Sequence, residues 1–226
     1  MKKYFIIGII TFFYLNSSAQ NHKNSFFIKD TRIKFIIYQT LSDYRNNKTL
    51  KLSQENLLHA HEVSDKYIWV KKFLSVTNGK ERKKIRKSFA IEYDGIKYFN
   101  LQNSVDANAP FTYVRFDIEG KVFAIFIDKN SPLVIRDSGK DYSSGLLVTG
   151  PRKWGKSWLS ENGIRKQILF LNPQWRDYSG NIVANYLTRS QAATLFNLQM
   201  DKKQLRNISF EEIVELIKKY NQEDKI

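Results

Sequence analysis

The strongest constraint on the fold is the dipeptide Asp94-Gly95, which separates two segments of alternating apolar and polar residues in SFAIEYDGIKYFNL. Glycine supplies the positive φ that the second position of a two-residue type I′ turn requires, so the stretch predicts an antiparallel hairpin. The turn fixes the register of the two strands. The expected pairs are Tyr93 with Ile96, Glu92 with Lys97 and Ile91 with Tyr98. The apolar face of this hairpin would carry Phe89, Ile91, Tyr93, Ile96 and Tyr98.

A second hairpin is predicted in FTYVRFDIEGKVFAIFID, with its turn at Glu119-Gly120. This register would place Val114, Phe116 and Ile118 beside Lys121, Phe123 and Ile125. The run VFAIFI is apolar at both alternating positions, which is typical of a strand covered on both faces. We therefore expect it to lie centrally in the sheet.

Further segments rich in β-branched and aromatic residues predict additional strands. They are RIKFIIY at 32–38, KYIWVKKFLSVT at 66–77, PLVIR at 132–136, GLLVT at 145–149 and KQILFL at 166–171. A helical turn or two is expected from Thr40, with Asp43 completing a cap. The segment 52–61 is ambiguous between helix and loop.

After Pro173 the pattern changes to the helical period. Thr188 with Gln191 and Ser209 with Glu212 form capping boxes, each at the start of a predicted helix. In the second helix an apolar stripe recurs at i, i+3, i+4 and i+7, formed by Phe210, Ile213, Val214 and Ile217. The sequence thus predicts one α+β domain over 20–226, with an antiparallel, β-rich body mainly in 26–172 and helices mainly in 188–223.

The N-terminal segment has the pattern of a secretory signal peptide over 1–19. Lys2 and Lys3 precede an apolar run at 4–15 and a small-residue end, Ser-Ser-Ala. The run is too short to span a bilayer, so we expect an exported protein, periplasmic or secreted, with no transmembrane segment in the mature chain. The sequence contains no cysteine, so neither a disulfide nor a lipid anchor on cysteine is expected.

Basic residues outnumber acidic ones, 37 to 22, giving a formal charge of +15. They are spread along the chain, but the run KERKKIRK is the densest. Its candidate contacts for an anionic partner, such as an envelope surface or a glycan, are Lys80, Arg82, Lys83, Lys84, Arg86 and Lys87. Together with the nearby Tyr67, Trp69 and Phe73 they could form a basic and aromatic surface. The alternative is a solvated edge strand whose lysines prevent edge-to-edge pairing.

The octapeptide GPRKWGKS, Gly150 to Ser157, fits the phosphate-loop pattern G-x-x-x-x-G-K-[ST]. A bulky Trp154 stands before the second glycine, where it would obstruct close wrapping of phosphates. A working loop also opens a helix, yet Asn162-Gly163 predicts a turn soon afterwards. We therefore interpret the match as accidental and expect no nucleotide.

Two histidines lie close together in His59-Ala60-His61-Glu62. On a strand their rings would share a face and could bind a metal; on a helix they would point apart. Since few other potential ligands exist, surface histidines with no metal or cofactor are expected. Paired carboxylates for a glycan hydrolase remain as an alternative, because Glu92, Asp94, Asp117 and Glu119 flank the two predicted turns.

Three segments, IIYQTLSDYRNNK at 36–48, RKSFAIEYDGIKYFNL at 86–101 and IVELIKKYNQE at 213–223, resemble a group of uncharacterised exported proteins of Bacteroidota. Members begin with a strand and turn of the form Y-x-[ST]-x-x-[DE]-[FY]-x-x-N-K, and the matching residues here are Tyr38, Thr40, Asp43, Tyr44, Asn47 and Lys48. The resemblance implies export and a small mixed domain, but no activity. We therefore expect a non-enzymatic envelope or secreted protein that binds a partner or serves as an accessory, with the glycan hydrolase as the alternative.

Overall fold

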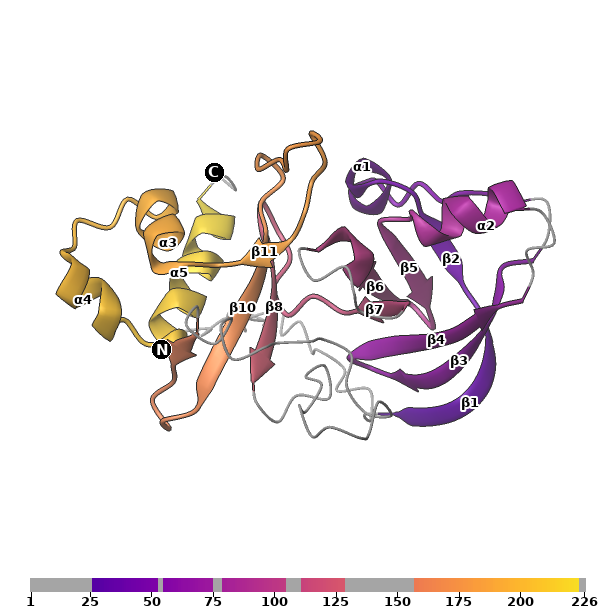
Figure 1. The fold of residues 1–226 in the computed structure, drawn as a ribbon, viewed down its shortest axis with the longest axis horizontal. Helices are drawn as coiled ribbons and strands as arrows, with labels where there is room; N and C mark the ends of the chain where they lie inside the picture. The colour runs from indigo at the N-terminus through magenta and orange to yellow at the C-terminus, as the bar shows by residue number, and fades with distance from the viewer. Residues whose placement is uncertain (1–25, 53–54, 75–78, 105–110, 129–156, 224–226) are drawn as a thin grey trace, which may run out of the picture.

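A curled antiparallel sheet of seven strands forms one end of the protein in the computed structural model (Figure 1). The structure describes residues 26–52, 55–74, 79–104, 111–128 and 157–223. The sheet has the order β1-β3-β4-β7-β6-β5-β2. Its strands are β1 (Phe27–Lys34), β2 (Ile36–Tyr38), β3 (Leu57–Ser64), β4 (Tyr67–Phe73), β5 (Ala90–Tyr93), β6 (Ile96–Asn100) and β7 (Thr112–Val114).

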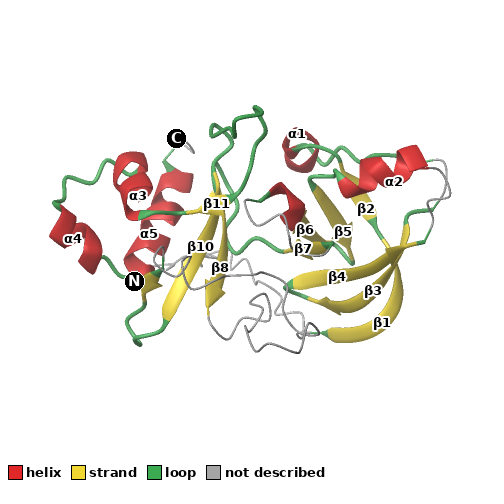
Figure 2. Cartoon of the chain, in the orientation of Figure 1, coloured by secondary structure: helices red, strands yellow, loops and turns green. Residues whose placement is uncertain are grey.

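A smaller sheet and three helices form the other end (Figure 2). The sheet contains β8 (Phe123–Asp128), β9 (Trp158–Leu159), β10 (Arg165–Leu171) and β11 (Asn185–Tyr186), in the order β11-β10-β8 with β9 also paired to β10. The helices on its outer face are α3 (Arg189–Leu195), α4 (Lys202–Asn207) and α5 (Phe210–Gln222). Two short helices, α1 (Leu41–Arg45) and α2 (Gly79–Arg86), and a 3₁₀ turn, η1 (Leu101–Asn103), belong to the first end. The predicted α+β fold class is confirmed.

The predicted strand over 32–38 is divided at Phe35 into β1 and β2. β1 pairs with β3, whereas β2 pairs with β5 at the opposite margin of the same sheet. The amide of Phe35 donates instead to the carbonyl of Asn56 at 3.1 Å. One short stretch of chain thus supplies both margins of the curled sheet.

The hairpin at Asp94-Gly95 is confirmed with its predicted register. Strands β5 and β6 pair Tyr93 with Ile96, Glu92 with Lys97 and Ile91 with Tyr98. Both turn residues have positive φ, 50° for Asp94 and 73° for Gly95, as a type I′ turn requires. Phe89 is the exception, because it lies before the strand and packs in a different cluster from Ile91 and Tyr98.

The hairpin predicted at Glu119-Gly120 is wrong. β7 pairs with β4 and β6 in the large sheet, while β8 pairs with β10 in the small one. The strand-like pairing across the turn is limited to an isolated bridge between Ile118 and Ala124, beside which the amide of Asp117 donates to the carbonyl of Ala124 at 2.8 Å. Among the described strands, β8 lies at an end of the small sheet and β10 lies centrally, in contrast to the central position expected for β8.

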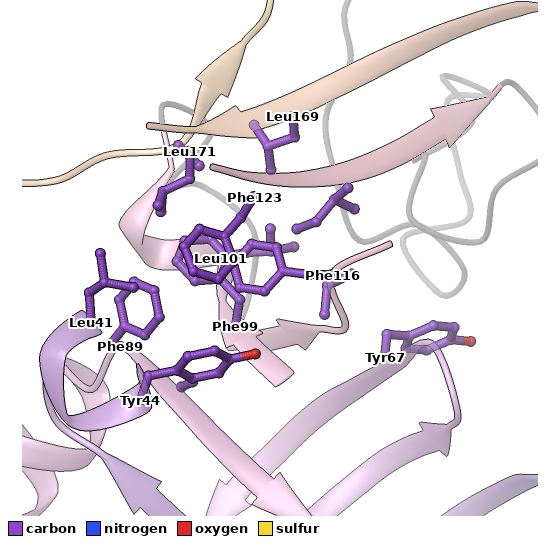
Figure 3. Close-up of a cluster of buried hydrophobic side chains, with 14 of the residues drawn as sticks. Leu41, Tyr44, Tyr67, Phe89, Phe99, Leu101, Phe116, Phe123, Leu169 and Leu171 are labelled. Carbon is purple, nitrogen blue, oxygen red and sulfur yellow. The ribbon is translucent and has the colours of Figure 1, made fainter. Parts of the chain in front are cut away.

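Packing between the two sheets explains why VFAIFI is apolar on both faces. Alternate residues Phe123, Ile125 and Ile127 join a cluster shared with the large sheet, which also contains Phe99 and Leu169 (Figure 3). The intervening Val122 and Ala124 face a second cluster beneath the helices. One face of β8 is therefore covered by the large sheet and the other by helices. This packing buries both faces of β8 without the central position that we expected.

The C-terminal helix packs as its pattern predicts. All four stripe residues, Phe210, Ile213, Val214 and Ile217, are buried against β8 and β10. Both predicted capping boxes form, at Thr188 with Gln191 and at Ser209 with Glu212. Thr40 and Asp43 form another at the start of α1. The helix after Thr188 ends at Leu195.

The ambiguous segment 52–61 contributes to a strand, β3, and the segment predicted as a strand over 66–77 forms β4 and ends at Phe73. The strand expected at 166–171 is β10. The strands expected at 132–136 and 145–149 and the leader lie outside the described residues. Within the described ranges, no helix has both the length and the apolar character needed to cross a membrane.

Candidate functional site

The basic run from Lys80 to Lys87 forms helix α2 and the turn that follows it, so the edge-strand interpretation is wrong. Lysine, arginine and glutamate have high helix propensity, and the run contains only one β-branched residue, Ile85. That residue is fully buried in the core inside the curled sheet. It thereby determines which face of α2 is turned toward the protein.

Four lysines lie on the opposite face of α2, at the spacing i, i+3, i+4 and i+7. They are Lys80, Lys83, Lys84 and Lys87, and all are exposed. At about 100° per residue this spacing aligns the four side chains along one side of a helix. We call these residues the lysine stripe. Lys87 follows the last helical residue, but its amide donates to the carbonyl of Lys83 at 3.1 Å and continues the turn.

Side chains of the large sheet, and Gln39 directly after β2, fix the C-terminal end of α2. Asn100 Nδ2 donates to the carbonyl of Arg86 at 2.9 Å, and Gln39 Nε2 to that of Lys84 at 3.3 Å. The hydroxyl of Tyr113 donates to the carbonyl of Ile85 at 3.4 Å. These bonds satisfy carbonyls that a helix end leaves unpaired. The lysine stripe is consequently presented on a helix held in one orientation.

Arg86 and Arg82 differ in their surroundings. The guanidinium of Arg86 lies over the ring of Phe111, 4.6 Å from its centroid, and the residue is half-buried. Arg86 therefore contributes to packing, unlike the other five predicted contacts. Arg82 is exposed but lies outside the lysine stripe, about 100° around the helix from Lys83.

The lysine stripe brings like charges together on the helix surface. Lys80 and Lys84, and Lys83 and Lys87, are i,i+4 neighbours, and each such like-charge pair destabilises a helix by about 0.2–0.5 kcal/mol. Among the described residues no carboxylate forms a salt bridge with Lys83, Lys84 or Lys87. An anion bound along the stripe would relieve this repulsion.

The aromatic half of the predicted surface is wrong. Tyr67 and Phe73 are buried in the two core clusters of the large sheet. Trp69 is half-buried and its ring lies against His61, with centroids 4.6 Å apart. Tyr67 and Trp69 pack in one cluster, whereas Phe73 packs in the other, because the pairing of β4 with β3 shifts register between them. None of the three joins the surface of α2.

The two histidines lie on strand β3 and approach the same carboxylate, as the strand alternative predicts. Asp30 Oδ1 is 3.6 Å from His59 Nε2 and 3.7 Å from His61 Nδ1. Lys71 Nζ is closer, at 3.1 Å, and its hydrogen bond lowers the pKa of Asp30. Among the described residues, no three His, Cys, Asp or Glu side chains are arranged to hold a metal ion.

The four candidate carboxylates occupy separate settings. Glu92 accepts a 2.5 Å hydrogen bond from the buried hydroxyl of Tyr38 on β2. Asp117 forms a salt bridge with Lys66 at 2.5 Å and accepts the amide of Phe126 at 2.7 Å. Asp94 is exposed in the hairpin turn, and Glu119 is also exposed. The pKa of Tyr44 is raised mainly by the burial of its phenol and, to a smaller extent, by the negative charge of Glu119. Glu92 and Asp117 thus form contacts that hold strands and loops together.

Most of the phosphate-loop match, Gly150 to Lys156, lies outside the described residues. Its last residue, Ser157, is buried and directly precedes strand β9. The expected turn at Asn162-Gly163 is present, with a φ of 76° at Gly163, and it connects β9 to β10. A strand therefore follows Ser157 at the place where a phosphate loop would open a helix.

Three of the residues that match the motif at 38–48, Tyr38, Tyr44 and Asn47, contact Lys97 on β6. The Nζ atom of Lys97 lies 4.8 Å from the ring centroid of Tyr38 and 4.7 Å from that of Tyr44. It donates to the carbonyl of Tyr44 at 3.1 Å and to Oδ1 of Asn47. Since Thr40 and Asp43 cap α1, five of the six matching side chains have a role in packing or capping.

Sequence reasoning missed a cavity of about 730 Å³ beside helix α3. Its walls come from 175–177 and Val183 in the loop joining β10 to β11, from Asn185 on β11, and from four residues of α3. These four are Ser190, Gln191, Thr194 and Leu195. The signal was the segment PQWRDYSGN, in which Trp175 and Tyr178 stand among proline, glycine and asparagine. Exposed aromatic residues within turn sequences are candidates for contacts with a ligand.

Comparison of the chain with known protein families, with curated proteins and with solved structures finds no match.

Proposed function

We propose that this protein is an exported, non-enzymatic binding protein of the cell envelope or the secreted fraction, and that helix α2 binds an anionic polysaccharide. The observation that carries the proposal is the lysine stripe, in which four exposed lysines lie on the face of α2 opposite the buried Ile85. A polyanion with regularly spaced charges can contact several of them at once. Its binding would remove the like-charge repulsion within the helix.

A polysaccharide fits the stripe better than insertion into a lipid bilayer. A membrane-inserting helix requires an exposed apolar face, but the only aliphatic residue of α2, Ile85, is fully buried. The partner must therefore be reached through charges and hydrogen bonds at the surface. Lysine ammonium groups are hydrated point charges that suit flexible, repeated contacts of this kind.

The direct test is binding to heparin, used as a model acidic polysaccharide, by calorimetry at two salt concentrations. A variant with Lys80→Gln, Lys83→Gln, Lys84→Gln and Lys87→Gln should bind at least about tenfold more weakly, a loss of about 1.4 kcal/mol. Affinity of the wild type should fall as salt rises, because salt screens exposed charges. Arg86 stays unchanged, since it packs on Phe111.

The matched control removes the same net charge elsewhere, through Lys48→Gln, Lys51→Gln, Lys72→Gln and Lys203→Gln, all exposed positions. Retained affinity in this control shows that the stripe matters beyond overall charge. Equal losses in both variants, or no binding of the wild type at low salt, would overturn the proposal. Stronger binding to anionic lipid vesicles than to heparin would identify a membrane surface as the partner instead. Release of reducing ends from the polysaccharide would contradict the non-enzymatic assignment.

A further inference from the structure

The cavity beside α3 is bounded by a loop whose conformation is fixed by its own hydrogen bonds. Asp177 accepts the amides of Ser179 at 2.9 Å and Asn181 at 2.8 Å, and its own amide donates to the carbonyl of Asn181 at 3.0 Å. Earlier in the loop, Asn172 Oδ1 accepts the amide of Gln174 at 2.9 Å. A wall ordered before a ligand arrives costs less conformational entropy on binding.

Both charged side chains in the cavity wall contribute to holding this loop. The carboxylate of Asp177 accepts two backbone amides, and these bonds lower its pKa. Arg176 Nη1 donates to the carbonyls of Pro173 and Trp175. Since one positive and one negative charge line the wall, their formal charges cancel. The cavity therefore offers no net charge to attract an ion.

The remaining polar wall consists of uncharged amides and hydroxyls. Asn185 lies on β11, while Ser190, Gln191 and Thr194 lie on α3. Gln191 uses its side-chain oxygen in the capping box, which leaves its NH₂ group as a donor. Amides and hydroxyls both donate and accept hydrogen bonds, so they suit a ligand that carries many hydroxyl groups.

The apolar part of the wall consists of the aromatic side chain of Trp175 with Val183 and Leu195. Trp175 packs against Phe170, with ring centroids 5.5 Å apart, and remains only half-buried. Tyr178, at the tip of the same loop, is fully exposed at 112% of the reference area. A rigid aromatic ring beside uncharged donors and acceptors is complementary to a sugar ring, which has apolar C–H faces and a polar hydroxyl edge.

We propose that this cavity is a binding site for a neutral carbohydrate chain. A sugar ring stacks on Trp175, and its hydroxyls bond to the amide and hydroxyl groups of Asn185, Gln191 and Thr194. Tyr178 forms a second platform for a neighbouring ring outside the cavity. This site is independent of the lysine stripe, because it involves none of the residues of α2 and requires no charge on the ligand.

The experiment is a calorimetric and tryptophan-fluorescence titration of the full chain with neutral hexasaccharides of glucose, mannose and N-acetylglucosamine. At least one should bind, with an affinity that changes less than about twofold between 50 and 500 mM salt because no charges are paired. Two variants test the wall. Trp175→Ala should weaken binding at least about tenfold, and so should Ser190→Trp, which fills the cavity from an exposed helix position.

Gln174→Ala is the matched control, since this exposed residue lies on the same loop outside the cavity wall. Its affinity should equal that of the wild type. Failure of the whole panel to bind, binding that survives Ser190→Trp, or binding restricted to charged saccharides would overturn the proposal. The four-lysine variant of α2 should bind the neutral chain normally, so failure of either proposal is distinguishable from failure of the other.

Discussion

The side-chain amide of Asn221 on α5 pairs with both backbone groups of Val122 at the entrance to β8. The amide of Val122 donates to Asn221 Oδ1 at 3.0 Å, and Asn221 Nδ2 donates to the carbonyl of Val122 at 3.1 Å. The same loop is held from the other side by Arg45 on α1, whose Nη2 donates to the carbonyls of Gly120 and Lys121. Two helices from opposite ends of the chain thus fix the crossing between the sheets.

Gly120→Ala should destabilise the protein through this contact. A Cβ atom at position 120 would lie 2.5 Å from Cγ of Asn221 and would displace the amide from Val122. The expected cost is about 1–3 kcal/mol, from lost hydrogen bonds and local overpacking. Urea denaturation measures it. Gly79→Ala is the control, because nothing lies within 4 Å of a Cβ there, and it should change the free energy of unfolding by less than about 0.5 kcal/mol.

The Gly120→Ala effect should depend on Asn221. In an Asn221→Ala background the clash is absent, so the two substitutions together should cost less than the sum of their separate effects by about 0.5 kcal/mol or more. Strict additivity in this double-mutant cycle would contradict the proposed contact.

Lys97→Met should also destabilise the protein, although the substitution retains much of the side-chain volume. It removes the contacts of the ammonium group with the rings of Tyr38 and Tyr44 and leaves the carbonyl of Tyr44 without this donor. We expect a loss of about 1–3 kcal/mol. The check compares the thermal unfolding of this variant with that of Lys48→Met, a substitution at an exposed position that should have little effect on stability. Equal stability of the two variants would disprove the role of Lys97.

Stability should fall at alkaline pH because six tyrosines have raised pKa values. Burial is the largest cause for each of Tyr38, Tyr44, Tyr67, Tyr98, Tyr113 and Tyr186. Their phenols ionise more readily in the unfolded chain, so the stabilising contribution is complete below pH about 10 and is lost as the pH rises from there toward the folded-state values. The melting temperature should drop steeply above pH about 10. Tyr98→Phe, which also loses a 2.9 Å hydrogen bond to the carbonyl of Ser64, should make that drop shallower.

The lysines of the lysine stripe repel one another, so a bound polyanion should stabilise helix α2, and so should a reversal of one of these charges. In the absence of a ligand, Lys83→Glu should raise the free energy of unfolding by about 0.2–1 kcal/mol, because it replaces like-charge neighbours with pairs of opposite charge. The same variant should weaken heparin binding. A loss of both stability and binding would indicate that Lys83 has a structural role and would contradict the interpretation of the stripe as a surface feature. Chemical denaturation and calorimetry on the same samples separate the two quantities.

Local sequence signals predicted the parts of the fold that local chemistry determines. The turn at Asp94-Gly95, the capping boxes and the stripe of α5 each depend on residues within about one element, and all are present. The divergence of β7 and β8 was not predictable in this way. Glu119-Gly120 resembles a hairpin turn, but the pairing partners of the two strands lie far away in the sequence.

The candidate sites show the same division. The basic run was visible in the sequence, whereas its arrangement as a stripe depends on Ile85 being buried beneath α2. The cavity beside α3 required segments around Trp175, Val183 and Thr194 to meet in space. The residue pattern within one segment does not show which distant segments it will contact. The aromatic residues in the loop between β10 and β11 could still have indicated a binding site.

The division at Phe35 has a consequence for how the chain assembles. Strands β1 and β2 are the first of the large sheet to be synthesised, yet β2 must wait for β5, whose Ala90 pairs with Tyr38. Closing the long loop between β2 and β5 lowers the conformational entropy of the chain before the strand pairing stabilises it, and this slows folding. Strand β1, in contrast, needs only β3, so the two halves of one short stretch are secured at different stages, and the backbone groups of β2 lack their sheet partners until β5 pairs with them.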